Sequence, residues 1–182
     1  MRWMLFMLSG MMFAMTFTSC SKDDDETGGG GGGNVVVIDT EETENGYYDG
    51  TLYYQISSNT SQSKEVTVYK CNSLATDVEI PSYVNIKGTK YKVVAIDRYT
   101  FSSWTDGKKD GPGSKLKNIK IPNTITCIGY YVFSRCSGLT SVTIPNSVTS
   151  IGGSTFYGCS GLASIIFQSA TPPSIFEFGI RK

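Results

Sequence analysis

The chain has 182 residues, 40% of them hydrophobic, and its 16 Lys and Arg residues balance 16 Asp and Glu residues. This length accommodates one ordinary domain with appendages. The sequence contains no histidine, which excludes Ser-His-Asp triads, Cys-His dyads, HExxH zinc sites and histidine proton shuttles. The composition therefore favours a protein that is not an enzyme, and we expect no catalytic residue, metal site or cofactor.

An apolar segment opens the chain. It runs for 15 residues from Trp3 to Phe17, fewer than the roughly 20 that a membrane-spanning helix needs, and it predicts a signal peptide over residues 1–19. The following Phe17-Thr18-Ser19-Cys20 resembles the lipobox of bacterial lipoproteins. That resemblance implies lipid attachment at Cys20, since several acyl chains make a stable membrane anchor. The alternative is a plain secretory signal with Cys20 as an incidental thiol.

Residues 20–46 have the composition of a flexible tether. The acidic run from Ser21 to Glu26 resembles the signal that sends some Gram-negative lipoproteins to the outer face of the outer membrane. The glycine run from Gly28 to Gly33 is typical of a flexible spacer. We therefore expect a cell-surface lipoprotein of the outer membrane, with a domain that faces the periplasm as the alternative.

The neutral total conceals an uneven distribution of charge. Residues 21–49 carry nine acidic side chains and one basic side chain, a net charge of −8. Residues 50–182 carry 14 basic and seven acidic side chains, a net charge of +7. A basic domain favours acidic partners such as anionic glycans. The alternative is a charge that serves solubility and is offset by the chain's own tether.

Residues 47–73 predict a β-type N-terminal cap. Two β-type runs, Leu52–Ile56 and Val66–Tyr69, are separated by a polar segment. We expect them to form a hairpin over the open end of the domain that follows, because the terminal units of repeat proteins need such covers.

The domain over residues 74–182 contains an internal repeat of 23 residues. The segment Leu116–Gly129 aligns without gaps on Leu139–Gly152, and Phe133 and Cys136 recur as Phe156 and Cys159. An upstream unit from Val78 to Phe101 contains a nine-residue insertion, which predicts a hairpin around residues 87–90. A further strand is expected at 162–167, before two prolines stop the pattern.

The repeat Leu-x-x-Ile-x-Ile-Pro-x-x-Val-x-x-Ile-Gly-x-x-x-Phe-x-x-Cys resembles the BspA-like leucine-rich repeat family of bacterial surface proteins. Alternation in Ser141–Ile144 agrees with a strand that buries one face. The predicted fold class is mostly β: a short leucine-rich-repeat solenoid of 23-residue BspA-like coils with an N-terminal β-hairpin cap. Cys136 and Cys159 occupy equivalent positions, where parallel Cβ vectors favour a buried thiol ladder over a disulfide.

The outward positions of the first strand of each coil predict a possible binding face. They form two columns, Asp77, Asn118, Ser141 and Ser164 beside Glu79, Lys120, Thr143 and Ile166. Within them Asn118, Lys120, Ser141, Thr143 and Ser164 are the candidate binding residues. Solenoids offer such polar sheet faces as extended binding surfaces, although any solvated sheet face has the same appearance.

The family resemblance implies an adhesion module that binds host or bacterial macromolecules and reaches the membrane through its lipid. The expected partners are an extracellular protein or glycan, and no nucleic acid is expected. Two alternatives stay open: a glycan-binding accessory lipoprotein for polysaccharide capture, which exposed aromatic residues would favour, and a truncated remnant of a repeat protein.

Overall fold

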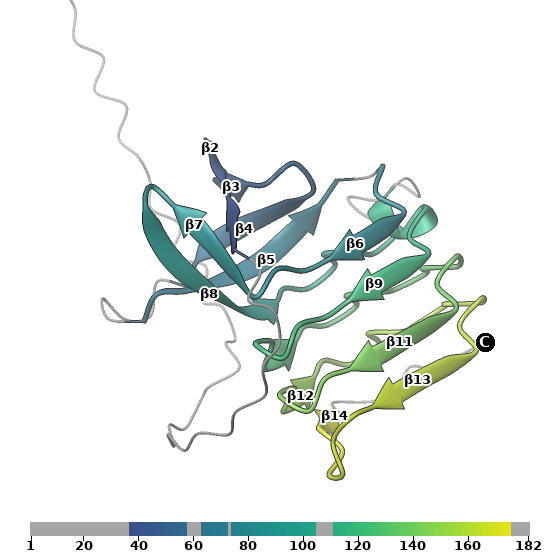
Figure 1. The fold of residues 1–182 in the computed structure, drawn as a ribbon. Coiled ribbons are helices and arrows are strands. Elements are labelled where there is room, and N and C mark those ends of the chain that lie inside the picture. Colours follow the sequence, from purple (N-terminus) through teal and green to yellow (C-terminus); the bar gives the residue numbers. More distant parts are fainter. Residues whose placement is uncertain (1–36, 58–62, 73, 105–110, 176–182) are drawn as a thin grey trace, which may run out of the picture.

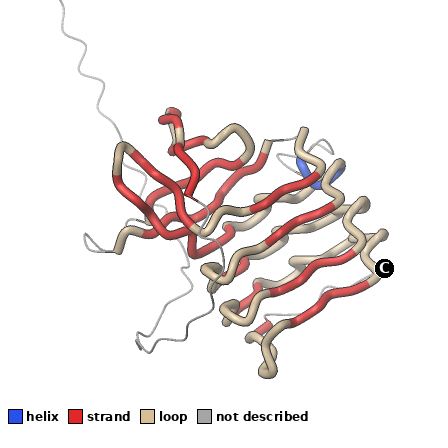
Figure 2. Tube along the Cα trace, viewed as in Figure 1, coloured by secondary structure: helices blue, strands red, loops and turns tan. Residues whose placement is uncertain are grey.

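The computed structural model describes residues 37–57, 63–72, 74–104 and 111–175. The expected signal peptide, Cys20 and the glycine run lie outside these ranges. Short strands joined by turns dominate, with one 3-10 turn, η1 (Pro112–Ser114) (Figure 2). Within the described ranges no helix has the length and apolar character needed to cross a bilayer.

Residues 77–104 and 111–175 form a solenoid with two columns of short strands (Figure 1). The first column contains β6 (Asp77–Glu79), β9 (Asn118–Lys120), β11 (Ser141–Ile144) and β13 (Ser164–Phe167). The second contains the end of β8 (Thr89–Ile96), then β10 (Cys127–Ile128), β12 (Ser150–Ile151) and β14 (Ser174–Ile175). Parallel pairing of Ser141 with Ser164 and of Cys127 with Ser150 confirms the predicted 23-residue register.

The N-terminal cap is an antiparallel meander of β2 (Glu41–Thr43), β3 (Gly46–Tyr48), β4 (Leu52–Ile56) and β5 (Glu65–Cys71). Pairing of β4 with β5 confirms the predicted hairpin. The cap joins the solenoid through its backbone, because β5 pairs in parallel with β8 and Val68 lies opposite Ile96. One continuous sheet therefore runs from the cap into the second column.

Ordered structure begins earlier than the sequence predicts. Residues 37–46, which we assigned to the flexible tether, form β1 (Val37–Asp39), β2 and the start of β3. β1 pairs in parallel with β7 (Tyr83–Ile86), and the Asn85 side chain donates a hydrogen bond to Asp39 at 2.9 Å. Without β1, the outer edge of β7 would present unpaired backbone N–H and C=O groups. Pairing with β1 supplies hydrogen-bond partners along that edge.

The predicted insertion is an antiparallel hairpin of β7 and β8. Its two turn residues, Lys87 and Gly88, have φ angles of 51° and 77°. Two successive positive φ angles define the type I′ turn, whose twist matches that of the flanking strands. Glycine at the second position adopts this conformation at little cost.

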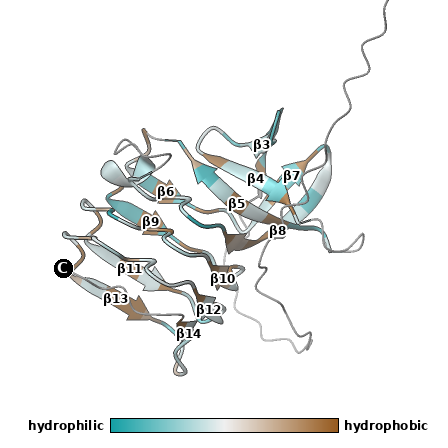
Figure 3. Ribbon diagram, turned by 180° about the vertical axis from the view of Figure 1, so that it is seen from behind, coloured by the Kyte–Doolittle hydropathy of each residue, from teal (hydrophilic) through white to brown (hydrophobic). Residues whose placement is uncertain are grey.

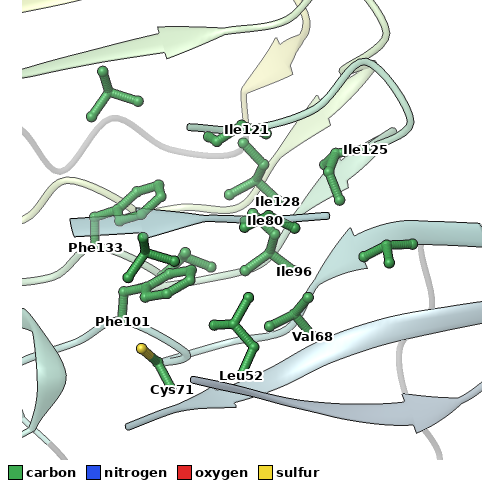
Figure 4. Close-up of a cluster of buried hydrophobic side chains, with 14 of the residues drawn as sticks. Leu52, Val68, Cys71, Ile80, Ile96, Phe101, Ile121, Ile125, Ile128 and Phe133 are labelled. Carbon is green, nitrogen blue, oxygen red and sulfur yellow. The ribbon is translucent and has the colours of Figure 1, made fainter. Parts of the chain in front are cut away.

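The core is continuous from the cap through the coils. Leu52 and Val68 of the cap lie beside Ile96 of the first coil (Figure 4). Phe101, Phe133 and Phe156, one from each successive coil, stack with ring centroids 5.5 Å apart. The repeated phenylalanine therefore packs between successive coils.

Candidate binding surfaces

The first column of strands presents the predicted face. In β6 and β9, Asp77 pairs with Asn118 and Glu79 with Lys120. In β11 and β13, Ser141 pairs with Ser164 and Thr143 with Ile166. All eight outward side chains are exposed, and the four strands lie in a row (Figure 1). The structure thus brings Asn118, Lys120, Ser141, Thr143 and Ser164 together on one side of the solenoid, as the sequence predicts.

The charged half of this face is internally compensated. The Asn118 amide donates a hydrogen bond to the Asp77 carboxylate at 2.6 Å, and Lys120 forms an ion pair with Glu79 at 2.6 Å. Hydrogen bonds from Asn118 and Thr76 hold the pKa of Asp77 below its usual value. These exposed charged and amide groups already have partners within the face. The hydroxyl groups of Ser141, Thr143 and Ser164 are therefore more available to a ligand.

The face becomes apolar toward β13. Ile166 and Phe167 are 52% and 38% exposed, and the hydropathy colours of Figure 3 mark the end of β13 as hydrophobic. The sequence has no charged residue between Cys136 and Ile175. The solenoid therefore changes along its length from a charged surface near the cap to an uncharged one.

A second candidate surface lies on the third side of the coils, where a turn segment follows each strand of the second column. We call it the turn ladder, and it comprises residues 99–104, 131–136 and 154–159. Its rungs are joined by backbone hydrogen bonds, such as Phe101 N–H to the Val132 carbonyl and Phe133 N–H to the Thr155 carbonyl. Each rung begins with a residue in the left-handed region, at Tyr99, Tyr131 and Ser154.

Aromatic side chains project from this ladder. The rings of Tyr99 and Tyr131 stack with centroids 5.1 Å apart and an interplanar angle of 3°. Tyr99 is 43% exposed, and the adjoining Tyr130 is 50% exposed. The guanidinium of Arg135 lies 4.6 Å from the centroid of the Trp104 ring and 5.8 Å from that of Tyr157. This cluster was not predicted from the sequence, although Tyr99 and Tyr131 both stand two residues before the repeated phenylalanine.

Beneath the ladder, Cys136 and Cys159 are free thiols, as predicted. Their Sγ–H groups donate to the carbonyls of Phe101 and Phe133 at 3.1 and 2.9 Å, each reaching the preceding coil. The neighbouring Cys159 thiol and burial raise the pKa of Cys136. The Cys136 thiol therefore serves packing between coils rather than nucleophilic chemistry, which requires the thiolate.

The cap contains buried polar groups with structural partners. Tyr54 donates its hydroxyl hydrogen to Asp49, and burial followed by the Asp49 charge raises the pKa of Tyr54. Burial and the same carboxylate raise the pKa of Cys71 to about 12. Asp49 also accepts hydrogen bonds from the backbone N–H groups of Thr51 and Leu52. This network orders the turn between β3 and β4.

Among the described residues, no group of three His, Cys, Asp or Glu side chains is placed to hold a metal ion.

Comparison with known proteins gives the family of the repeats. Residues 112–178 match the family model described as "BspA type Leucine rich repeat region (6 copies)". No curated protein matches the chain.

Two solved structures are similar in fold. A leucine-rich repeat protein from Bacteroides ovatus is 34% identical, with a TM-score of 0.53, over 63% of this chain and 27% of its own. A leucine rich cell surface protein from Faecalibacterium prausnitzii is 24% identical, with a TM-score of 0.54, over 70% of this chain and 33% of its own. The chain thus spans about a quarter to a third of the length of these two proteins.

Proposed function

Because its repeats belong to the BspA type leucine-rich repeat family, we propose that the chain is a surface-anchored lipoprotein whose solenoid binds a protein ligand. Repeats of this kind are binding scaffolds, and the described residues build a scaffold of that form. The observation that carries the proposal is the row of exposed side chains on β6, β9, β11 and β13. Solenoids use such extended faces for recognition.

Two features support this face as a contact surface. Its strands are fixed by parallel backbone pairing and by buried residues such as Val142 and Ile144, each 1% exposed. A ligand that binds there pays little ordering cost, because the outward side chains stand on a preformed framework. The exposed Ile166 and Phe167 next to the hydroxyl groups add the apolar contact that interface centres require.

Membrane attachment is proposed through Cys20, on the strength of the Phe17–Cys20 sequence and the apolar run before it. The first experiment is protease shaving of intact cells that express the protein, with mass spectrometry of peptides from residues 47–175. Release places the domain outside the cell. Retention until the outer membrane is opened contradicts the surface location and favours the periplasmic alternative. A Cys20→Ala variant should move the protein from the membrane to the soluble fraction.

The binding face is tested with Thr143→Lys, which places a long charged side chain in the middle of the face. Thr143 is exposed, so the variant should fold. We expect at least about a tenfold loss of affinity, ~1.4 kcal/mol, for host matrix proteins or neighbouring bacteria captured by the wild type. Thr149→Lys is the matched control, because Thr149 is also exposed but precedes the second-column strand β12. Equal losses in the two variants would contradict the assignment.

A further inference from the structure

The turn ladder carries the most exposed aromatic surface among the described residues outside the cap and β13. Tyr99 and Trp104 of the ladder are exposed by 43% and 37%, and the adjoining Tyr130 by 50%. The ladder also carries Arg135, which is exposed. None of them belongs to the first-column face. Exposed tyrosine, tryptophan and arginine together are the composition of binding hot spots.

The guanidinium of Arg135 lies between two aromatic rings. The Trp104 ring, from the preceding coil, and the Tyr157 ring, from the following coil, both lie within cation–π range of its guanidinium. Stacking on rings occupies the faces of a guanidinium and leaves its N–H edge available for a carboxylate. The ion pairs among the described residues are Lys87–Glu42 and Lys120–Glu79, so within that part of the chain Arg135 has no carboxylate partner.

The stack of tyrosine rings includes the first two turns of the ladder and not the third. Tyr99 and Tyr131 stack on each other, while the equivalent position in the next coil is Ser154, which carries no ring. Within the described residues, the face of Tyr131 turned away from Tyr99 therefore meets no third aromatic ring. All three positions require a left-handed backbone, which glycine or asparagine adopts more readily than tyrosine. Tyr99 and Tyr131 therefore adopt this backbone conformation at an energetic cost.

We propose that the turn ladder is a second binding site, for an anionic polysaccharide built of uronic acids. In this site the Arg135 guanidinium donates hydrogen bonds to a sugar carboxylate, and a pyranose ring packs on the face of Tyr131 turned away from Tyr99. A pyranose offers an apolar C–H face and a polar rim, which matches the apolar face and polar edge of tyrosine. The net charge of +7 over residues 50–182 favours approach of a polyanion. The site is independent of the protein ligand proposed for the first column.

The test is isothermal titration calorimetry of the folded chain with oligogalacturonate and hyaluronan oligosaccharides at low ionic strength. We expect saturable binding of at least one of them. The matched ligand control is methyl-esterified oligogalacturonate, which keeps the sugar ring and removes the charge. It should bind at least about tenfold more weakly than oligogalacturonate, as expected for loss of a charge-assisted contact.

Two variants locate the site. Arg135→Gln should weaken binding of the responding oligosaccharide at least about tenfold, while Lys64→Gln, the same charge change at an exposed residue before β5, should change it less than about twofold. Tyr131→Ser, which introduces the residue that the next coil tolerates at this position, should weaken it about fivefold. Circular dichroism of each variant verifies the fold.

Three results would overturn the proposal. They are an absence of saturable binding to both oligosaccharides, equal losses in Arg135→Gln and Lys64→Gln, and binding of poly-glutamate that matches the sugars and ignores Tyr131→Ser. The last result would assign the site to acidic proteins. Because Thr143→Lys leaves the turn ladder unchanged, failure of this proposal and failure of the first-column proposal are distinguishable.

Discussion

Two neighbouring strands, β11 and β13, carry nearly the same motif and differ in burial. Val142 and Ile144 of β11 are each 1% exposed, whereas the equivalent Ile165 is half-buried and Phe167 is 38% exposed. The same holds for Phe133, at 0% exposure, and the half-buried Phe156. The coil to which a residue belongs determines whether its side chain points inward. How far that side chain is buried depends on the coil stacked after it. The stabilising energy of this fold therefore lies between coils.

The cap end shows how such burial is completed. Leu52 and Val68 of the cap are 1% and 0% exposed, and they bury Ile96 of the first coil to 1%. Parallel pairing of β5 with β8 also satisfies the backbone of the first coil. The edge of β13 lacks such a neighbour among the described residues, and its coil has no charged side chain to discourage pairing with another strand.

The strongest test of this comparison is the pair Phe133→Ala and Phe156→Ala. Phe133 stacks on rings from both neighbouring coils, so its truncation should lower the free energy of unfolding by about 3–5 kcal/mol. Phe156 stacks on one ring and is half-buried, so we expect about 1–2 kcal/mol. Urea denaturation followed by circular dichroism measures both.

If Phe133→Ala leaves too little folded protein to measure, Phe133→Leu provides a milder change of about 1 kcal/mol. Equal losses at positions 133 and 156 would contradict the conclusion that burial depends on the following coil.

A smaller effect is expected from Gly152→Ala. A Cβ atom at this position would lie 2.5 Å from the backbone nitrogen of Tyr130 in the preceding coil. The two coils would have to separate, at a cost of about 1–3 kcal/mol in the free energy of unfolding. Ser160→Ala, at an exposed residue, is the control and should stay within about 0.5 kcal/mol. An unchanged denaturation midpoint for Gly152→Ala would show that the coils are looser than described.

Much of this architecture follows from the sequence because a 23-residue period repeats its inward residues in register. The period predicted the pairing of Ser141 with Ser164 and the equivalence of Phe133 and Phe156, and the segment around Lys87 and Gly88 predicted the inserted hairpin. Local residue types carry that information, since alternation and turn chemistry act over a few positions. The candidate binding columns were predictable for the same reason.

Other features depend on contacts between distant segments. The pairing of β1 with β7 joins residues 46 positions apart, and no local pattern in an acidic, glycine-flanked segment predicts it. The placement of Arg135 between Trp104 and Tyr157 likewise arises because turns of three coils converge. Only the matching offsets of Tyr99 and Tyr131 from the repeated phenylalanine were visible in the sequence.

Thiol reactivity provides a further test of the coils that contain Phe133 and Phe156, because each also contains a cysteine, Cys136 or Cys159. The neighbouring Cys159 thiol and burial raise the pKa of Cys136, which reduces its thiolate fraction near pH 8. The Cys136 side chain is also fully buried. We expect iodoacetamide to modify Cys159 at least about tenfold faster than Cys136, because access to Cys136 requires the last coil to detach. Peptide mass spectrometry after native labelling measures the two rates. Equal rates would mean that these coils open together.

The smallest expected effect concerns the charged half of the first column. Hydrogen bonds from Asn118 and Thr76 lower the pKa of Asp77, so in the folded state this carboxyl stays ionised to lower pH than in the unfolded chain. Its contribution to stability is present above the unfolded-state pKa and is lost as pH falls through the folded-state pKa. In Asn118→Ala the pKa of Asp77, followed by carbon-detected NMR, should rise toward the ordinary value, while Lys115→Ala, at an exposed residue, should leave it in place. A pKa unchanged by Asn118→Ala would show that the contact between β6 and β9 side chains is not maintained in solution, and would leave that half of the face open to a ligand.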